Sequence, residues 1–285
     1  MEKFKGWDSI DSSKVSREET DAAWIAVQKK IERPARVWRF GWFAVAAAVA
    51  VALISPVAAY VWVSRQEVNV PLMCQTSTSR GEVREVILPD GTKAVLNAET
   101  VLVYPEKFGA ERSVFLSGEA SFDVTSDEAH PFYVKTSDVT VKVHGTRFNV
   151  NAYFDSPSVR ATLYRGVITA YPSDSEERAV TLAPNQYFDY ERQTGAITTA
   201  TTNALEAVAW ENGDLCFRSV PIRSVAKIIE RRFDVTIDLT TDRYNSAVIT
   251  ANFIHGETLD DLMGAICMIV PGMRYTREEN RIYLK

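Results

Sequence analysis

The chain has 285 residues, of which 46% are hydrophobic, and its 32 basic and 37 acidic side chains leave a net charge of −5. A chain of this composition can bury a core, which excludes wholesale disorder. The slight acidic excess also excludes the strongly basic surface that is typical of nucleic-acid-binding proteins.

Residues 1–39 are too few to build a domain with its own core. Within them, Ser16 and Glu19 have the spacing of a capping box, which predicts a helix that begins after Ser16. Trp24, Val27 and Ile31 would lie on one face of that helix. Such a stripe suits a protein partner. The alternatives are a helix that lies on lipid and one that merely precedes the next segment.

An uncharged segment follows, because no Asp, Glu, Lys or Arg lies between Arg39 and Arg65. As a helix, residues 40–63 would span about 36 Å, enough to cross a hydrocarbon core of about 30 Å. Aromatic residues at both ends suit the two interfaces, and Pro56 would kink the helix. The alternatives are a buried core helix and a cleaved signal peptide, but the 39 preceding residues are too many for an ordinary signal. We expect an uncleaved single-pass membrane helix.

The charges on either side of this segment predict its orientation. The N-terminal flank carries five basic residues, Lys29, Lys30, Arg33, Arg36 and Arg39, whereas residues 64–79 carry only Arg65 and Glu67. The positive-inside rule therefore predicts a cytoplasmic N-terminus, with residues 64–285 on the other side of the membrane.

After a linker at 64–80, residues 81–195 read as an all-β domain. Short strand patterns alternate with turn signals such as Pro89-Asp90-Gly91, Ser117-Gly118-Glu119 and Arg165-Gly166, which predicts a sandwich, a barrel or a solenoid-like stack. The expected strands are Val83–Leu88, Lys93–Leu96, Ser113–Leu116, Ala120–Val124, Phe132–Lys135, Val139–Val143, Phe148–Ala152, Ser158–Tyr164 and Val167–Tyr171.

The stretch KVHGTRFNV at 142–150 interrupts its strand pattern at Gly145. Glycine in a strand usually marks a bulge or a close backbone approach, and we expect a bulge here. The alternative is chemistry, because a Thr146 hydroxyl attacks a preceding carbonyl most easily when that residue is glycine.

Little in the sequence points to an enzyme. Glu119 and Asp123 would share one face of a strand, as a glycosidase pair might, but no G-x-S-x-G elbow or phosphate-binding loop is present. His130, His144 and His255 lack ligand spacing, so we expect no metal and no cofactor. Cys74, Cys216 and Cys267 are expected to be small buried thiols, with a Cys216–Cys267 bridge as the alternative outside the cytoplasm.

Residues 205–285 predict a small α+β module of βαββαβ-like order. A strand at Asp214–Arg218 leads into a helix that begins at 219–221, with Pro221 in its first turn and Ile222, Val225, Ile229 and Phe233 at helical spacing. Thr258 and Asp261 predict the start of a second helix. Both helices are expected to pack on one face of a single sheet, formed by Val235–Leu239, Val248–Phe253 and a closing hairpin of Arg274–Arg277 and Arg281–Leu284.

Several motifs in this order resemble the FecR-type transmembrane regulators, which are anti-sigma factors. They are LPDGTKAVLNAETVLVYPEKF (88–108), VFLSGEASFDV (114–124), HPFYVKT (130–136), VHGTRFNVNAY (143–153) and, before the apolar segment, TDAAW (20–24). ENGDLCFRSVPIRSVAKIIERRFDV (211–235) is similar to the C-terminal domain of the Bacteroidetes members, which itself resembles the short N-terminal domains of secretins and TonB-dependent receptors.

This resemblance implies an inner-membrane transducer with a cytoplasmic N-terminus and a periplasmic C-terminus. Its expected partners are an extracytoplasmic-function sigma factor in the cytoplasm, which the stripe of Trp24, Val27 and Ile31 would bind, and the signalling domain of an outer-membrane TonB-dependent transporter in the periplasm. On the same template Thr146 would be the nucleophile of a self-cleavage at Gly145, with His144 moving a proton. The alternative functions are an envelope scaffold without cytoplasmic output and a membrane-tethered glycan-active enzyme.

Overall fold

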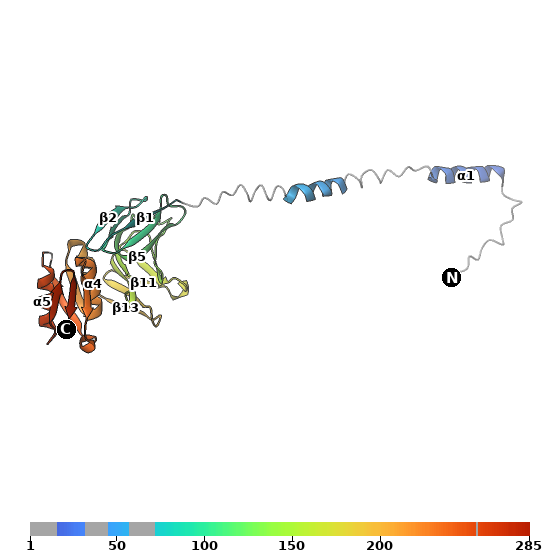
Figure 1. Cartoon of the computed structure of the whole chain (residues 1–285). Coiled ribbons are helices and arrows are strands. Elements are labelled where there is room, and N and C mark those ends of the chain that lie inside the picture. The colour runs from blue at the N-terminus through green and yellow to red at the C-terminus, as the bar shows by residue number, and fades with distance from the viewer. Residues whose placement is uncertain (1–15, 32–44, 57–71, 255) are drawn as a thin grey trace. The chain divides into compact units, whose positions relative to one another are not determined.

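A computed structural model describes residues 16–31, 45–56, 72–254 and 256–285 (Figure 1). Residues 1–69 and 70–285 form two separate units, and each is described by itself.

The first unit contains helix α1, Arg17–Ile31, which begins after Ser16 as the sequence predicts. The Ser16 hydroxyl accepts a hydrogen bond from the Glu18 amide at 3.2 Å, which satisfies one free donor of the first turn. Trp24 and Val27 are 68% and 45% exposed, so their predicted stripe is open to a partner. The side chain of Ile31 lies outside the described residues.

Residues 45–56, within the segment predicted to cross the membrane, are helical and exposed. The rest of that segment, residues 40–44 and 57–63, lies outside the described part of the chain. None of the described helices has both the length and the apolar character that a membrane crossing needs. The single-pass helix therefore stays a prediction.

The β domain, which we define as residues 73–201, is built on one 13-stranded sheet. Its main path runs β11-β10-β7-β6-β5-β8-β9-β12-β13. Two further pairs of strands join β5: β4, which also pairs with β1, lies beside the first half of β5, and β3, which also pairs with β2, lies beside the second half. The strands are β1 Met73–Ser77, β2 Arg84–Ile87, β3 Lys93–Leu96, β4 Val101–Pro105, β5 Arg112–Asp123, β6 Phe132–Lys135, β7 Val139–Val143, β8 Arg147–Ala152, β9 Ser158–Arg165, β10 Ile168–Pro172, β11 Val180–Leu182, β12 Gln186–Glu191 and β13 Ile197–Thr201, with a 3-10 turn η1 at Glu176–Arg178.

One hydrophobic core fills this domain. Buried side chains from both halves of the sheet meet in it, including Phe122 of the β8 half and Phe132 of the β6 half, whose ring centroids lie 6.2 Å apart. The sheet therefore folds over on itself as a sandwich does, which is one of the architectures that the regular strand spacing predicts.

The predicted turn at Ser117-Gly118-Glu119 is wrong, because β5 runs through it as a single 12-residue strand. The first half of β5 pairs with β4 and β6, and the second half pairs with β3 and β8. Gly118, with φ of +118°, lies where the strand passes from one half of the sheet to the other. The glycine allows a bend in a continuous strand. In the sequence, a glycine that allows a bend cannot be distinguished from a glycine that ends a strand in a turn.

The strands β4, β11 and β12 are absent from the expected set, and two edge strands lie outside the predicted all-β range of 81–195. Met73–Ser77 (β1) falls within the predicted 64–80 linker, and Ile197–Thr201 (β13) falls in a threonine-rich stretch beyond residue 195. Both strands are largely polar and exposed, so they lack the apolar alternation that reveals a strand. Pairing with β4 and β12 places them in the sheet.

The C-terminal module, which we define as residues 204–285, has a second hydrophobic core of its own. Its elements are α3 Ala204–Ala207, η2 Ala209–Asn212, β14 Leu215–Pro221, α4 Ile222–Phe233, β15 Thr236–Leu239, η3 Asp242–Tyr244, β16 Val248–Phe253, α5 Leu259–Ile269, β17 Tyr275–Glu278 and β18 Arg281–Leu284. The capping box predicted at Thr258 and Asp261 is confirmed at the start of α5.

The strands of this module differ from the expected single sheet. β14 pairs only with β16, whereas β15 pairs in parallel with β18, which continues antiparallel to β17. Pro221 also ends β14 and caps α4, instead of lying in the first helical turn. Its φ of −57° suits either place, so the sequence does not distinguish them.

Candidate functional site

One face of the sheet half formed by β5, β8, β9 and β12 is polar. Strand pairing aligns Ser121, Asn149, Thr162 and Tyr187 in one row across this face. The neighbouring row consists of Glu119, Asn151, Arg160 and Asp189. Residues between these rows, such as Ala120 and Val150, point to the opposite face and into the core.

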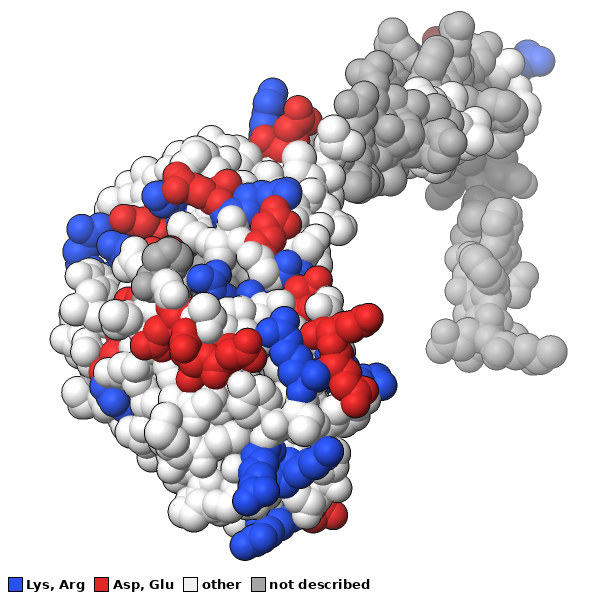
Figure 2. Space-filling view, turned by 60° about the vertical axis from the view of Figure 1, so that its left-hand side comes forward, with Lys and Arg blue, Asp and Glu red and all other residues white. Residues whose placement is uncertain are grey.

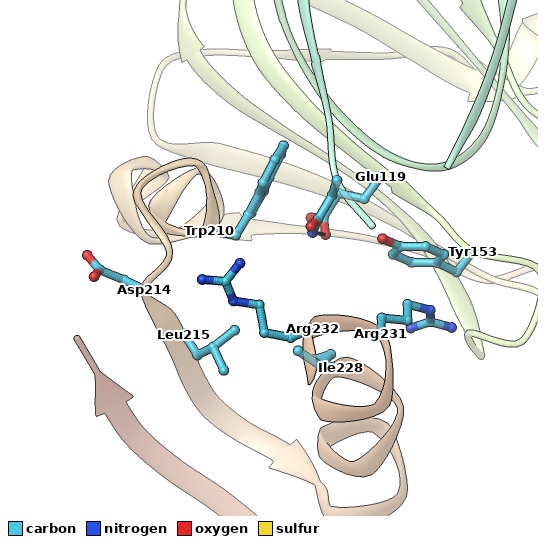
Figure 3. A pocket seen from close by; sticks show the side chains of 9 residues that line it. Glu119, Tyr153, Trp210, Asp214, Leu215, Ile228, Arg231 and Arg232 are labelled. Atoms are coloured by element: carbon cyan, nitrogen blue, oxygen red, sulfur yellow. Dashed lines mark hydrogen bonds between the residues drawn. The ribbon is translucent and has the colours of Figure 1, made fainter. Parts of the chain in front are cut away.

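This polar face is covered by the C-terminal module without being filled by it. Ser121, Asn149 and Thr162 are each only 4% exposed, yet a hollow of about 390 Å³ remains between the face and the residues of β14 and α4. A smaller adjoining hollow is shown in Figure 3, where Glu119 and Tyr153 of the β domain face Arg231 and Arg232 of α4, with Trp210 beside them. We call the two hollows together the polar cleft. They share the lining residues Asn97, Glu119, Trp210, Asp214, Leu215 and Ile228.

Glu119 is the carboxylate that faces this cleft. Its two oxygens accept hydrogen bonds from the amide nitrogens of Asn97 at 2.8 Å and Asn149 at 2.9 Å. Burial raises the pKa of Glu119 above its ordinary 4.5, because the charged form loses water, while the amide hydrogen bonds lower it by less. Burial therefore makes protonation of this carboxyl group easier than in water, and the protonated form can both donate and accept a hydrogen bond.

Arg231 of α4 connects the two sides of the cleft, one formed by the β domain and the other by the C-terminal module. Its guanidinium lies over the ring of Tyr153, 3.8 Å from the centroid, and forms an ion pair with Asp155. Its Nε atom also lies 3.4 Å from an oxygen of Glu99. The side chain of Arg231 is only 7% exposed, so these contacts hold a buried charge between the β domain and the C-terminal module.

Three buried polar atoms of the cleft have no hydrogen-bond partner among the described residues. They are Oδ1 of Asn149, an acceptor, and Nε1 of Trp210 and Nε of Arg231, both donors. Native proteins rarely leave such atoms unpaired, and exceptions mark positions where water or a ligand completes the contacts. The cleft therefore offers unsatisfied groups of both kinds to an occupant.

Comparison with known proteins identifies the kind of chain that carries this cleft. The profile of the FecR protein family matches residues 75–169, and the profile of the FecR C-terminal domain matches residues 214–284. Two crystal structures of a candidate anti-sigma factor from Parabacteroides distasonis are 34% identical to this chain. Their matches cover 75% and 74% of this chain and 98% of theirs, with TM-scores of 0.71 and 0.70. The chain belongs to the FecR family. Among curated proteins, none matches this sequence.

Membership of the FecR family confirms the resemblance carried by the motifs at 88–153 and 211–235. Family membership alone does not show which residues form a site.

The two carboxylates of the FecR domain, Glu119 and Asp123, do not form a glycosidase pair. They lie on the same strand face, but Glu119 lines the polar cleft, whereas Asp123 lines neither of its hollows. Asp123 is exposed and pairs with Arg165 at 3.1 Å outside the polar cleft. The alternative of a glycan-active enzyme loses its candidate residues.

His144, Gly145 and Thr146 lie in the link between β7 and β8, so Gly145 is not the expected bulge within a strand. A Cβ on Gly145 would come within 2.7 Å of Ser126, so the glycine allows a close approach. Thr146 is 2% exposed, and its hydroxyl donates a hydrogen bond to the carbonyl of Val167 at 2.9 Å. Self-cleavage at Gly145-Thr146 stays a prediction.

The three cysteines are all free, and the alternative bridge between Cys216 and Cys267 is absent from the structure. All three are half-buried, so the expectation of buried thiols is wrong. Among the described residues, no group of three His, Cys, Asp or Glu side chains could hold a metal ion.

The residues that build the cleft were missed in the sequence, apart from Glu119. The alternation in RFNVNA predicts that Asn149 and Asn151 share one strand face, but it does not show that another module covers that face. Arg231 looked like an ordinary basic residue in the last turn of a helix. A possible signal was Trp210, the only tryptophan after residue 62.

The raised pKa of Glu119 predicts how stability depends on pH. Because folding raises this pKa, the contribution of Glu119 is fully present below about pH 4.5 and is lost as pH rises through the folded-state value. We expect Glu119→Gln, which cannot ionise, to lose less stability than the wild type as pH rises above about 4.5. Urea unfolding at a series of pH values measures this difference.

The matched control is Asp123→Asn, which removes an exposed carboxylate from the same strand. It should leave the pH profile close to that of the wild type. Parallel profiles for Glu119→Gln and the wild type would contradict the prediction.

Proposed function

We propose that this FecR-family chain is an inner-membrane anti-sigma factor that couples an outer-membrane TonB-dependent transporter to an extracytoplasmic-function sigma factor. The observation that carries the proposal is the order of its parts. An exposed helix with an apolar stripe precedes an uncharged segment of membrane-spanning length, and the two FecR domains follow. The similar Parabacteroides distasonis protein, described as a candidate anti-sigma factor, supports it.

The proposed roles follow from the chemistry of each part. Helix α1 would bind the sigma factor through Trp24 and Val27, because exposed aromatic and aliphatic side chains on one helix face fit an apolar groove. The positive flank would keep α1 in the cytoplasm. The β domain and the C-terminal module would then meet the transporter signal in the periplasm, and binding there transmits a signal only if it favours one state over another.

Charge alone does not indicate which surface would meet the transporter. Acidic and basic side chains are interspersed over much of the face shown in Figure 2, which includes the C-terminal module. Unpaired strand edges, such as that of β16 in the two-stranded sheet, are a second means of docking through strand addition.

The deciding experiment compares transcripts and sigma-factor capture in cells that express the full-length chain. Deleting residues 1–36 should change expression of a neighbouring transporter operon. Trp24→Glu should reduce the sigma factor that co-purifies with the chain by roughly tenfold or more, because an aromatic anchor is replaced by a charge.

Ala26→Glu is the matched control, since it adds the same charge to α1 about 200° around the helix from the nearby Trp24. It should leave capture unchanged. Equal loss with both variants would contradict a specific stripe, and an unchanged transcript profile after the deletion would favour an envelope scaffold without cytoplasmic output.

A further inference from the structure

The polar cleft has the chemistry of a binding site that the proposed signalling does not use. We propose that it binds a neutral saccharide. All the residues concerned lie in the β domain and the C-terminal module, so this inference is independent of any sigma-factor contact by α1.

The first argument for a saccharide is the presence of unpaired polar atoms in the cleft lining. Asn149 is 4% exposed, lines the larger hollow, and leaves its acceptor Oδ1 without a partner, while the nearby Trp210 leaves its donor Nε1 unpaired. Both atoms are buried beneath the lining, and a hydroxyl group that reaches them would donate to the first or accept from the second. Glu119, between Asn97 and Asn149, adds a group that accepts hydrogen bonds and, when protonated, donates one. A ligand with several hydroxyl groups matches this set of donors and acceptors, because each hydroxyl group can both donate and accept a hydrogen bond.

The second argument concerns the charged side chains of the cleft and whether they are paired. Arg160 pairs with Asp189 at 2.8 Å, and Arg218 holds Glu206 through two contacts at 2.7 and 3.0 Å. Because these charged groups neutralise one another, neither arginine of the larger hollow is free to select an anion. Arg231 and Arg232 line only the smaller hollow, where Asp155 holds Arg231. The expected ligand is therefore uncharged.

Shape and composition carry the third step. The hollow of about 390 Å³ lies within the range of small-molecule pockets, which runs from about 300 to about 1,000 Å³. Trp210 and Tyr187 present aromatic rings along a lining that is otherwise rich in Asn, Ser and Thr. Aromatic rings bury the apolar C–H faces of a sugar ring while amides and hydroxyl groups bind its edge, so a saccharide uses both parts of the lining.

The position of the cleft gives such a ligand contacts with both parts of the protein. Asn149 and Glu119 belong to the β domain, whereas Trp210 and Ile228 belong to the C-terminal module. A bound saccharide would stabilise the arrangement that Arg231 already holds, because it binds this arrangement in preference to a separated one.

Calorimetry and tryptophan fluorescence on the full-length chain test the proposal, in nanodiscs so that no detergent sugar headgroup competes. The probes are D-glucose, D-galactose, N-acetyl-D-glucosamine and maltose, each titrated to about 10 mM, which would detect a dissociation constant in the millimolar range. At least one should bind saturably at one site per chain and change the emission of Trp210.

Two cleft variants and one control locate the binding. Asn149→Ala and Trp210→Phe should each weaken binding roughly tenfold, the effect of losing one well-placed hydrogen bond. Phe154→Ala, which alters an 86% exposed side chain that does not line the cleft, should bind as the wild type does. If Asn149→Ala does not fold, the conservative Trp210→Phe decides alone.

Three results would overturn the inference. The first is the absence of binding by all four saccharides, which would leave the cleft filled with water. The second is binding that neither cleft variant weakens, since the saccharide would then occupy another site. The third is binding of inorganic phosphate or citrate in place of the sugars, because the site would then select an anion.

Discussion

Replacing Gly118 by alanine is expected to destabilise residues 70–285 by about 4 kcal/mol. A Cβ at this position would lie 2.4 Å from Oγ1 and 2.7 Å from the Cα atom of Thr100, and that backbone atom cannot move away cheaply. The φ of +118° adds strain for any residue with a side chain. Backbone strain of about 1–3 kcal/mol and overpacking of about 1–3 kcal/mol together set the magnitude. Urea unfolding followed by Trp210 fluorescence measures it.

Gly109→Ala is the matched control, because it is the same substitution at a glycine with no atom within 4 Å of an added Cβ. It should change the free energy of unfolding by no more than about 0.5 kcal/mol. A Gly118→Ala protein as stable as the control would mean that β5 does not bend at Gly118.

Removing the Arg231 side chain has the second largest expected effect. We expect Arg231→Ala to destabilise residues 70–285 by about 3 kcal/mol, since it leaves Asp155 without its cation, leaves Glu99 with Arg80 as its remaining cation, and uncovers the ring of Tyr153. The value lies at the low end for a buried ion pair, because Glu99 is 37% exposed and Asp155 is 26% exposed, so water can solvate both.

The control for this prediction is Arg223→Ala on the same helix. Arg223 is 60% exposed and pairs at 3.4 Å with Asp242, which is 90% exposed, so its loss should change stability by less than about 1 kcal/mol. Equal effects of the two substitutions would show that Arg231 does not hold the β domain and the C-terminal module together.

Local patterns were sufficient to predict much of the fold. Val139–Val143 and Val248–Phe253 are strands with the predicted bounds, because alternating apolar residues leave one face for a core. The capping box at Thr258 begins a helix for an equally local reason, since its hydrogen bonds join residues three apart. The wrong predictions concern residues that fit two local structures. Gly118 fits both a turn and a bend in a strand, and Pro221 fits both the first turn of a helix and the position before it.

The candidate site depended on contacts that no local pattern contains. Glu119 is separated by 30 residues from Asn149, its hydrogen-bond donor, and Asp155 is separated by 76 from Arg231. The sequence predicted a polar strand face at Asn149 and Asn151, and the ordinary expectation for such a face is contact with water. The C-terminal module covers it instead, which buries polar groups and leaves some of them unpaired.

By itself, therefore, the sequence determined the FecR family, the order of most strands and helices, and the two sets of apolar residues that form separate cores. These properties follow from residue periodicity, caps and motifs that act over a few positions along the chain. Only the tertiary structure decided that β5 serves both halves of the sheet, that Arg231 lies buried against Tyr153, and that a polar cleft surrounds Glu119. Burial and electrostatic environment depend on which distant segment covers a residue, and that is set by packing between modules.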